Sequence, residues 1–495
     1  MPIIITNASE LAQIGSSHSF PGNGSYILGN DIRITEPWRS LRFVDGITFD
    51  GNGHHIYTLD APLFSAIING AVRNLTLTLD EALAAPDVSG LVVDAVDTEF
   101  IGITTYGSIS SVYNAAGIAS YALRCSFIGC ENYASVTIDA GEVGGIAAYA
   151  YECDIIDCIN YADINGLRLD SEGGGVAGIF DASPPWGGHA PRTMRMDNCK
   201  NYGNISVGNY GGGITGSAQI GPYELIGCIN YGDVSPCLEA RVSYSATDHF
   251  GGVAGLLEKL PDSRGVAYGC ANCGEISGAL FVGGIAGSSF SCVVNNCESE
   301  GSVFGGSNVG GIVGFIEGAS EVSCNRCCGI ISAECDNAGG IVGFAERNPE
   351  DAPNLIIDNL AGNPSVSGRY SVHRVLGGEA QYADTEISGN IVSGEILLTG
   401  DNTGTGGLVY DYEPVFQNDP QLGDNRLQGA TFVCPPGERF EGCLGCVPDG
   451  IKPPRPPCCC DPCRCRPCCC RPKFFCLKLP RICLQLLALK LLMGR

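Results

Sequence analysis

The chain has 495 residues, with 28 Lys or Arg against 53 Asp or Glu and a formal net charge of −25. The charge is divided unevenly. Residues 451–495 hold ten Lys or Arg and one Asp, which leaves 18 basic and 52 acidic groups, a net of −34, in the first 450 residues. An acidic body of this kind should repel nucleic acid and anionic membrane surfaces, so we expect neither as a partner.

The chain opens on Met1-Pro2-Ile3 without a basic segment ahead of an apolar one, so no secretory signal peptide is predicted. No stretch of roughly 18 apolar residues is free of charges, so no transmembrane helix is predicted either. Taken literally, these features predict a cytoplasmic protein or one that leaves the cell by an unusual route.

Residues 1–80 are predicted to form an N-terminal cap and the first turns of the fold. The run Asn7-Ala8-Ser9-Glu10 has the form of a capping box, which predicts a short helix with a polar outer face. Trp38 is expected to fill the interior beneath this cap. His54 and His55 lie beside turn glycines, which favours corner residues over metal ligands.

The segment 81–412 is built on a repeated phrase, Gly-Gly-hydrophobic-small-Gly or a close variant. The steps between its hydrophobic anchors are 30, 38, 39, 32, 27 and 29 residues, a period typical of stacked repeats. The seven copies occupy residues 144–148, 174–178, 212–216, 251–255, 283–287, 310–314 and 339–343.

A second phrase, Cys-x-Asn-Tyr followed by Gly or Ala, alternates with the first. Its tyrosine is lost in the fifth copy, its asparagine in the sixth, and around Asn325 the pattern slips further. If successive copies lie above one another, their asparagines should form a hydrogen-bonded amide ladder at a corner. The predicted ladder consists of Asn132, Asn160, Asn201, Asn230 and Asn272.

The repeats predict an all-β fold. Interior Gly costs a helix about 1 kcal/mol relative to Ala, and each repeat instead offers three short β-branched runs separated by Gly, Asn and Asp. Three strands and three corners make one rung of a solenoid, with about 4.8 Å between stacked rungs. We therefore predict a right-handed parallel β-helix, with Ile and Val pointing inward.

The N-terminal segments Ser25–Ile32, Trp38, Phe49–Ile56, Leu63-Phe64 and Gly70–Leu77 resemble the start of many bacterial β-helix surface proteins. The Gly-hydrophobic-x-Gly phrases are similar to the GLUG motif of the same proteins, and together the resemblance spans about residues 3–410. It implies a β-helix displayed outside the cell in an adhesin-like role. The absence of a predicted signal peptide departs from that pattern.

Two insertions lengthen the repeats after the anchors at Val176 and Val253. They leave the same arc of the rung, two rungs apart, so they should lie about 10 Å from each other and share a cleft. Its unusually basic and aromatic residues would suit a glycan or protein ligand, whereas the alternative is an ordinary surface loop. The candidate binding residues are Trp186, His189, Arg192, Lys259 and Arg264.

A third insertion, Pro236–Phe250, should leave from the opposite arc and not join that cleft. The acidic residues Asp163, Asp233 and Glu275 recur five positions after the repeat cysteine and should form an outward column. Hydrolysis of a polysaccharide requires paired carboxylates. This column follows the repeat and has no lysine column beside it, so we interpret it as solvated surface.

The cysteines form two populations, fifteen up to Cys335 and thirteen from Cys434 onward. Those in the body are predicted to be reduced thiols that fill the core. A transition segment, 413–450, leads to a basic Pro/Cys-rich tail, 451–495, that is largely irregular. Its cysteines should either cross-link chains or bind a thiophilic metal. The candidates for this role are Cys458, Cys459, Cys460, Cys463, Cys465, Cys468, Cys469 and Cys470.

The run Arg481–Leu492 has Leu at helical spacing and is either a short basic amphipathic helix or part of a disordered end. From the whole sequence we predict a non-catalytic structural or adhesive protein, without a cofactor apart from metal on the tail. It would associate with itself through that tail, at the cell surface, in a spore-associated layer or in the cytoplasm. The alternative is a protein that binds or degrades carbohydrate.

Overall fold

The computed structural model describes the first unit of the chain. The chain falls into two units, Met1–Pro454 and Arg455–Arg495, and the predicted tail segment 451–495 lies outside the described residues. Those residues are 1–80, 85–182, 192–242, 248–260, 263–347, 351–362, 365–369, 371–380, 385–392, 395–398 and 426–427.

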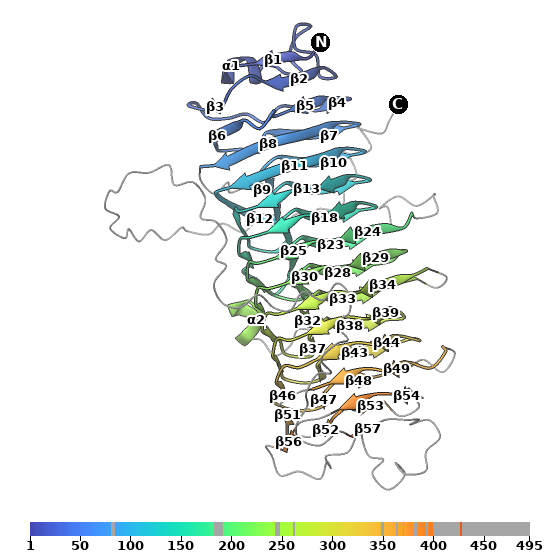
Figure 1. Cartoon of the computed structure of the whole chain (residues 1–495). Coiled ribbons are helices and arrows are strands. Elements are labelled where there is room, and N and C mark those ends of the chain that lie inside the picture. The colour runs from blue at the N-terminus through green and yellow to red at the C-terminus, as the bar shows by residue number, and fades with distance from the viewer. Residues whose placement is uncertain are drawn as a thin grey trace. The chain divides into compact units, whose positions relative to one another are not determined.

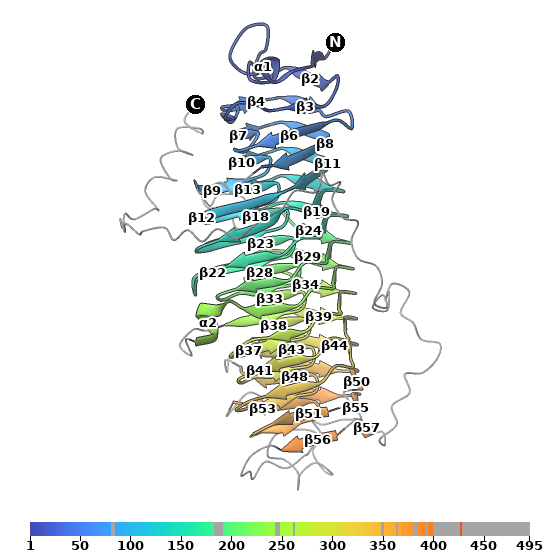
Figure 2. The ribbon, with the colours of Figure 1, turned by 90° about the vertical axis from the view of Figure 1, so that its left-hand side faces the viewer.

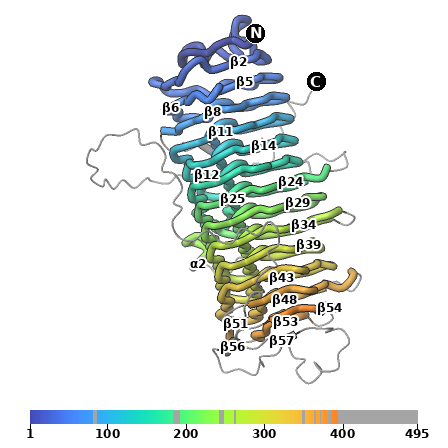
Figure 3. Tube along the Cα trace, viewed as in Figure 1, coloured from blue at the N-terminus to red at the C-terminus, as the bar shows by residue number. Residues whose placement is uncertain are grey.

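The first unit is a parallel β-helix, as predicted. All of its named strands pair in parallel and belong to three sheets. The named strands before β9 (Ala85–Ser89) belong to sheets 1 and 3, and from β9 to β53 (Leu376–Glu379) each rung contributes to all three sheets before the next rung begins. Figures 1 and 2 show the rungs following one another from the blue N-terminal end to the orange end of the described strands, and Figure 3 traces the same path. One rung consists of β14 (Ser126–Ile128) and β15 (Glu131–Asn132) in sheet 1, β16 (Ser135–Ile138) and β17 (Gly141–Gly144) in sheet 2, and β18 (Ala147–Tyr151) in sheet 3.

From β14 to β53 each rung has five strand segments instead of the predicted three, because sheets 1 and 2 are each interrupted. The rung before them has the predicted three, β11 (Glu99–Tyr106), β12 (Ser108–Ala116) and β13 (Ala119–Leu123). In sheet 1 the interruption between β14 and β15 is a residue in the left-handed conformation, such as Gly129 (φ 58°) and, one rung on, Asp157 (φ 53°). Gly, Asn and Asp hold most positions of this column because they adopt positive φ most easily. In later rungs, the strands of sheet 1 that occupy the position of β15, after the left-handed residue, are β20 (Ile159–Asn160), β25 (Lys200–Asn201), β30 (Ile229–Asn230), β35 (Ala271–Asn272), β40 (Glu298–Ser299), β45 (Arg326–Cys327), β50 (Leu360–Ala361) and β55 (Ile391–Val392).

Sheet 3 and the second half of sheet 2 meet at the Gly-Gly phrase. The sheet 2 strands that follow β17 are β22 (Ser171–Gly174), β27 (Gly211–Gly212), β32 (His249–Gly251), β37 (Phe281–Gly283), β42 (Val309–Gly310), β47 (Ala338–Gly339) and β52 (Val372–His373). The strands of sheet 3 are β4 (Val44–Asp45), β7 (Phe64–Ile68), β10 (Val92–Val96), β13 (Ala119–Leu123), β18, β23 (Ala177–Asp181), β28 (Thr215–Gln219), β33 (Ala254–Glu258), β38 (Ala286–Phe290), β43 (Val313–Glu317), β48 (Val342–Ala345) and β53 (Leu376–Glu379).

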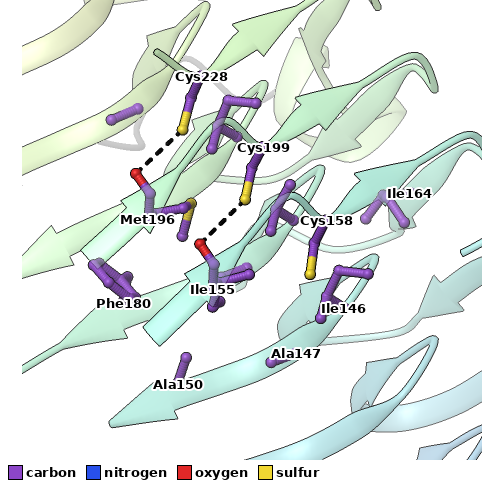
Figure 4. Packing of buried hydrophobic residues seen from close by; sticks show 14 of the residues in the cluster. Ile146, Ala147, Ala150, Ile155, Cys158, Ile164, Phe180, Met196, Cys199 and Cys228 are labelled. Carbon is purple, nitrogen blue, oxygen red and sulfur yellow. Dashed lines mark hydrogen bonds between the residues drawn. The ribbon is translucent and has the colours of Figure 1, made fainter. Parts of the chain in front are cut away.

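The core runs along the axis inside the three sheets. The hydrophobic anchor of each Gly-Gly phrase, from Ile146 to Ile341, is completely buried, as predicted. Cysteines stack beside the anchors. Figure 4 shows Cys158, Cys199 and Cys228 with their sulfurs on the same side, and the Cys199 and Cys228 thiols donate to carbonyl oxygens of the preceding rung at 3.3 and 3.4 Å.

The predicted asparagine ladder is present and completely buried. Each Nδ2 donates to the Oδ1 of the next rung: 2.8 Å from Asn132 to Asn160, 2.7 Å to Asn201, 2.8 Å to Asn230 and 2.9 Å to Asn272. Each amide also donates to the carbonyl two residues on in its own rung. A buried amide satisfied in this way avoids the cost of an unpaired polar group.

The second residue of the Gly-Gly phrase must be glycine because its Cα lies against an asparagine side chain of this ladder. A Cβ on Gly175 would lie 2.3 Å from Cγ of Asn201, and one on Gly213 would lie 2.2 Å from Cγ of Asn230. No side chain fits at such distances, so the two phrases of the repeat are locked together by packing.

At Asn325 the repeat exchanges two stacked positions: asparagine takes the place of the repeat cysteine, and cysteine takes the place of the repeat asparagine. Asn325 pairs in register with the position of Cys297, and Cys327 with the position of Ser299. The amide ladder therefore continues in the former cysteine column, where Asn325 donates to Asn359 at 3.0 Å and Asn359 to Asn390 at 2.9 Å. The former asparagine column becomes apolar.

The N-terminal helix α1 (Ala8–Leu11) forms where the capping box predicts it. The Oδ1 of Asn7 accepts from the Glu10 backbone N–H at 3.0 Å, and the Glu10 carboxylate accepts from the backbone of Thr6 at 2.7 Å. Trp38 is buried with only 8% of its surface exposed, as expected. The second helix, α2 (Leu238–Val242), lies in the insertion after β31 (Val234–Pro236) in sheet 2, the arc opposite the other two insertions.

Most cysteines of the body lie in the core. Eleven of them are buried, and burial raises the pKa of thiols such as Cys130 and Cys199. The prediction of reduced thiols is wrong for Cys273, which is disulfide-bonded. Cys273 follows the ladder in the half-exposed tyrosine column, and its side chain is therefore accessible where the core thiols are not.

Candidate functional site

The two predicted insertion loops do leave the same arc of the rung. The first follows β23 and precedes β24 (Met194–Asp197), and the second follows β33 and precedes β34 (Gly265–Tyr268), so both connect sheet 3 to sheet 1. Trp186 and His189 lie outside the described residues. The shared cleft therefore stays a prediction.

The guanidinium group of Arg192 is bound by residues of the β-helix. Its Nη1 forms an ion pair with Asp154 at 2.8 Å, and its Nε donates to the carbonyl oxygen of Glu152 at 2.9 Å. Arg264 is exposed, and its backbone carbonyl accepts from Tyr223 at 2.8 Å. Lys259 is half-buried and donates to the Leu260 carbonyl at 3.5 Å. Arg192 therefore has a structural partner that sequence reasoning did not foresee.

A second candidate surface lies at the corner between sheets 2 and 3, where sequence reasoning placed none. It consists of two columns of outward side chains. We call the sheet 2 members the corner column. Each lies two residues before a Gly-Gly pair, or before Ala116-Gly117 in the first case: Asn114, Glu142, Glu172, Tyr210, His249, Phe281, Asn308 and Asn337. Their counterparts on sheet 3 form the facing column: Asp94, Tyr121, Tyr149, Ile179, Ser217, Leu256, Ser288, Phe315 and Phe344.

Contacts between the columns show that they face each other. Asn114 donates to the hydroxyl of Tyr121. The Nδ1 of His249 lies 2.6 Å from Oγ of Ser288, and the rings of Phe281 and Phe315 are 4.9 Å apart.

The last glycine of the Gly-Gly phrase brings the two sheets together. A Cβ on Gly216 would lie 2.7 Å from the carbonyl oxygen of Gly178 and 2.9 Å from that of Tyr210, both backbone atoms. In the rung of Ile146 this position is Ala148, which is completely buried. The position therefore accepts a methyl group in one early rung and excludes it in later ones.

One half of the corner is acidic. Glu142 and Glu172 occupy adjacent rungs in register, both only partly exposed, and no Lys or Arg among the described residues forms an ion pair with either. Burial, with the charge of Glu142 nearby, raises the pKa of Glu172 to about 8. Burial raises the pKa of Glu142 to about 6, although the Tyr149 hydroxyl hydrogen bond opposes it. Burial and the charge of Asp87 raise the pKa of Asp94 to about 6.

The other half of the corner is aromatic. The ring of His249 lies 4.8 Å from those of both Tyr210 and Phe281, and the Phe315 ring lies 6.2 Å from that of Phe344. Burial lowers the pKa of His249 to about 4, so this imidazole is neutral at pH 7. The corner thus changes from carboxylates to aromatic rings along the axis.

The two carboxyl groups of the acidic half have raised and separated pKa values, about 8 for Glu172 and about 6 for Glu142. Adjacent groups with separated pKa values are the arrangement that acid and base catalysis uses. The residue two positions before each Gly-Gly pair was visible in the sequence, but only the fold shows that these residues share a column.

No protein-family model matches the chain, and no curated protein matches it either. Among solved structures, the chain is similar to one described as "a putative immunoglobulin A1 protease from Bacteroides ovatus". The two are 17% identical over 60% of this chain and 74% of that chain, with a TM-score of 0.29. A similarity this distant supports no statement about activity.

The acidic column predicted to be solvated surface is exposed, as expected. Asp163 and Asp233 each accept a backbone N–H from the next rung, at 2.9 and 2.8 Å. No group of three or more His, Cys, Asp or Glu among the described residues is arranged to hold a metal ion. Neither helix in the described part of the chain is long enough to span a bilayer. The tail cysteines lie outside that part.

Proposed function

We propose that the protein is a non-catalytic structural or adhesive β-helix, similar in role to the GLUG-motif surface proteins that its repeats resemble. The observation that carries the proposal is the amide ladder from Asn132 to Asn272, which is interlocked with the Gly-Gly phrases of those rungs. Nearly all repeated residues are used to hold one rung on the next. Such a body suits a stiff element that presents its outer surface.

The proposed location is the cell surface or an extracellular or spore-associated layer. Fractionation of the native cells, followed by detection of the protein in each fraction, tests it. We expect the protein in the surface or coat fraction. Recovery in the soluble cytoplasmic fraction alone would refute surface display.

The proposed anchor is the Cys-rich tail, through cross-links to other chains. Non-reducing gels should compare the oxidised full-length chain with a version that ends at Gly450. We expect covalent oligomers of the full-length chain that disappear on reduction, and monomers of the shortened one. If both remain monomeric after oxidation, the tail does not cross-link.

A second candidate function is the binding or hydrolysis of a polysaccharide. The corner favours it, because Glu142 and Glu172 lie in register on adjacent rungs and their pKa values are raised to different extents, the pairing that glycoside hydrolysis by two carboxyl groups uses. Glu172 would act as the acid and Glu142 as the nucleophile. Release of reducing sugars from a polysaccharide panel by the wild type, and its loss in Glu142→Gln and Glu172→Gln, is the expected result.

The matched control for that assay is Glu224→Gln, a carboxylate on sheet 1 that lies away from the corner. It should leave any turnover unchanged. A glycan array with the wild type and Trp186→Ala tests binding by the predicted insertion loops separately. If no polysaccharide is bound or cleaved, the carbohydrate function is excluded and the structural proposal stands.

A further inference from the structure

A third surface, at the corner between sheets 1 and 2, carries two parallel columns of side chains. The first is a stack of five half-exposed tyrosines whose neighbouring ring centroids are 4.4–5.2 Å apart and whose planes are within 14° of parallel. We call it the tyrosine ladder: Tyr106, Tyr133, Tyr161, Tyr202 and Tyr231.

The second column lies two residues further along each rung and is exposed. It contains Asp163, Asn204, Asp233 and Glu275, and each of the first three side chains accepts the backbone N–H of the next rung. No Lys or Arg among the described residues forms an ion pair with its three carboxylates. This flank of the ladder therefore carries uncompensated negative charge.

The opposite flank is close to neutral. In successive rungs it carries Glu131, Ile159, Lys200 and Ile229. The charges of Glu131 and Lys200 offset each other. The Tyr133 hydroxyl donates to Glu131 at 3.0 Å. The ladder is thus bordered by apolar side chains on one side and by carboxylates on the other.

The stacking determines which part of each tyrosine can meet a ligand. Each ring face inside the ladder is covered by the next ring, so the ring edges and hydroxyl groups point outward. Ring edges carry the positive end of the aromatic quadrupole and favour contact with the π face of another aromatic group. A flat molecule lying along the axis would contact several edges at once, at the spacing of the rungs.

We propose that the tyrosine ladder is a binding surface for flat, elongated, positively charged aromatic molecules. The ladder supplies van der Waals contact with ring edges and hydroxyl groups over successive rungs, and the carboxylate column supplies the attraction for the positive charge. This inference is independent of the proposed structural function and of any catalysis at the corner between sheets 2 and 3. A binding result here would leave both of those questions unchanged.

Thioflavin T, a flat cationic dye, is the probe, titrated against the full chain and followed by fluorescence. We expect saturable binding that weakens as salt is added, because exposed charges are screened. The double variant Tyr161→Leu/Tyr202→Leu interrupts the ladder at its centre and should lose at least about tenfold in affinity. Tyr268→Leu removes an exposed tyrosine outside the ladder and should bind like the wild type.

The charge contribution is tested by Asp163→Asn/Asp233→Asn, which keeps the oxygen that accepts each backbone N–H. Affinity for thioflavin T should fall about threefold to tenfold and lose most of its salt dependence. The uncharged analogue of the dye should bind both proteins equally. This variant also carries the test if the double tyrosine variant does not fold, as judged by circular dichroism.

Absence of thioflavin T binding to the wild type would overturn the proposal. So would wild-type affinity in a folded Tyr161→Leu/Tyr202→Leu variant, or equal loss in Tyr268→Leu. Preference for an anionic flat dye over thioflavin T would overturn the assignment of charge.

Discussion

The asparagine ladder and the corner column are both single columns that return once in every rung, yet they differ in how they vary. The ladder keeps Asn from residue 132 to residue 272, because each buried amide must satisfy the amides above and below it. The corner column changes from Glu to Tyr, His and Phe. Its members contact the facing column outside the core. Inward columns are thus constrained by their neighbours, and outward columns are free to specialise.

Breaking the asparagine ladder should have the largest effect on the free energy of unfolding. Asn201→Ala removes the partner of the Asn160 amide and of the Asn230 carbonyl oxygen, both fully buried. We expect a loss of about 2 to 5 kcal/mol in the free energy of unfolding, measured by urea denaturation. Asn204→Ala, on the same rung but exposed, is the control and should cost less than about 1 kcal/mol. Equal effects of the two variants would contradict the special status of the ladder.

Disturbing the contact between sheets 2 and 3 should have the second largest effect on the free energy of unfolding. Gly216→Ala places a methyl group 2.7 Å from a backbone oxygen, which forces the two sheets apart. We expect a destabilisation of about 1 to 3 kcal/mol in the same urea assay. Ala148→Gly, the reverse change at the equivalent position of an earlier rung, should cost about 1 kcal/mol or less. A Gly216→Ala protein as stable as the wild type would show that the sheets are not in close contact there.

The acidic half of the corner column should give stability a pH dependence. A carboxyl group with a pKa above its unfolded value binds more protons in the folded state. The contribution of Glu172 to stability is therefore fully present below pH 4.5 and is lost as pH rises through about 8. Glu172→Gln should be more stable than the wild type at pH 8 by about 1 to 2 kcal/mol and equal to it near pH 4.5. Thermal unfolding at the two pH values measures this. A constant difference at both would exclude Glu172 as the source.

Removing the Arg192–Asp154 ion pair, which belongs to neither the asparagine ladder nor the corner column, should have the smallest effect on the free energy of unfolding. Arg192→Ala removes the partner of Asp154, an ion pair near the surface. It should lower the free energy of unfolding by about 1 kcal/mol or less in urea denaturation, with a smaller loss at high salt. An effect as large as that of Asn201→Ala would mean that the loop attachment, and not the ladder, governs stability.

The pattern of the sequence predicted the inward columns well and the outward ones poorly. Anchors such as Ile146 and ladder members such as Asn160 repeat because core packing and buried hydrogen bonds allow few substitutes. Glu142 and Glu172 repeat only their place before the Gly-Gly pair, so no shared residue type marked their column. The insertion residue Arg192 looked free for a ligand because nothing in the sequence links it to Asp154, 38 residues earlier.

The sequence by itself determined the solenoid, its period and its amide ladder, since a strand stacked on its own copy is specified by one repeat. Only the tertiary structure decided that a left-handed residue divides the strands of sheet 1 from β14 onward and that the ladder moves to the cysteine column at Asn325. It also decided that the outward faces of sheets 2 and 3 meet. These features depend on backbone angles, register and contact between different sheets, which a pattern of residue types along one chain does not record.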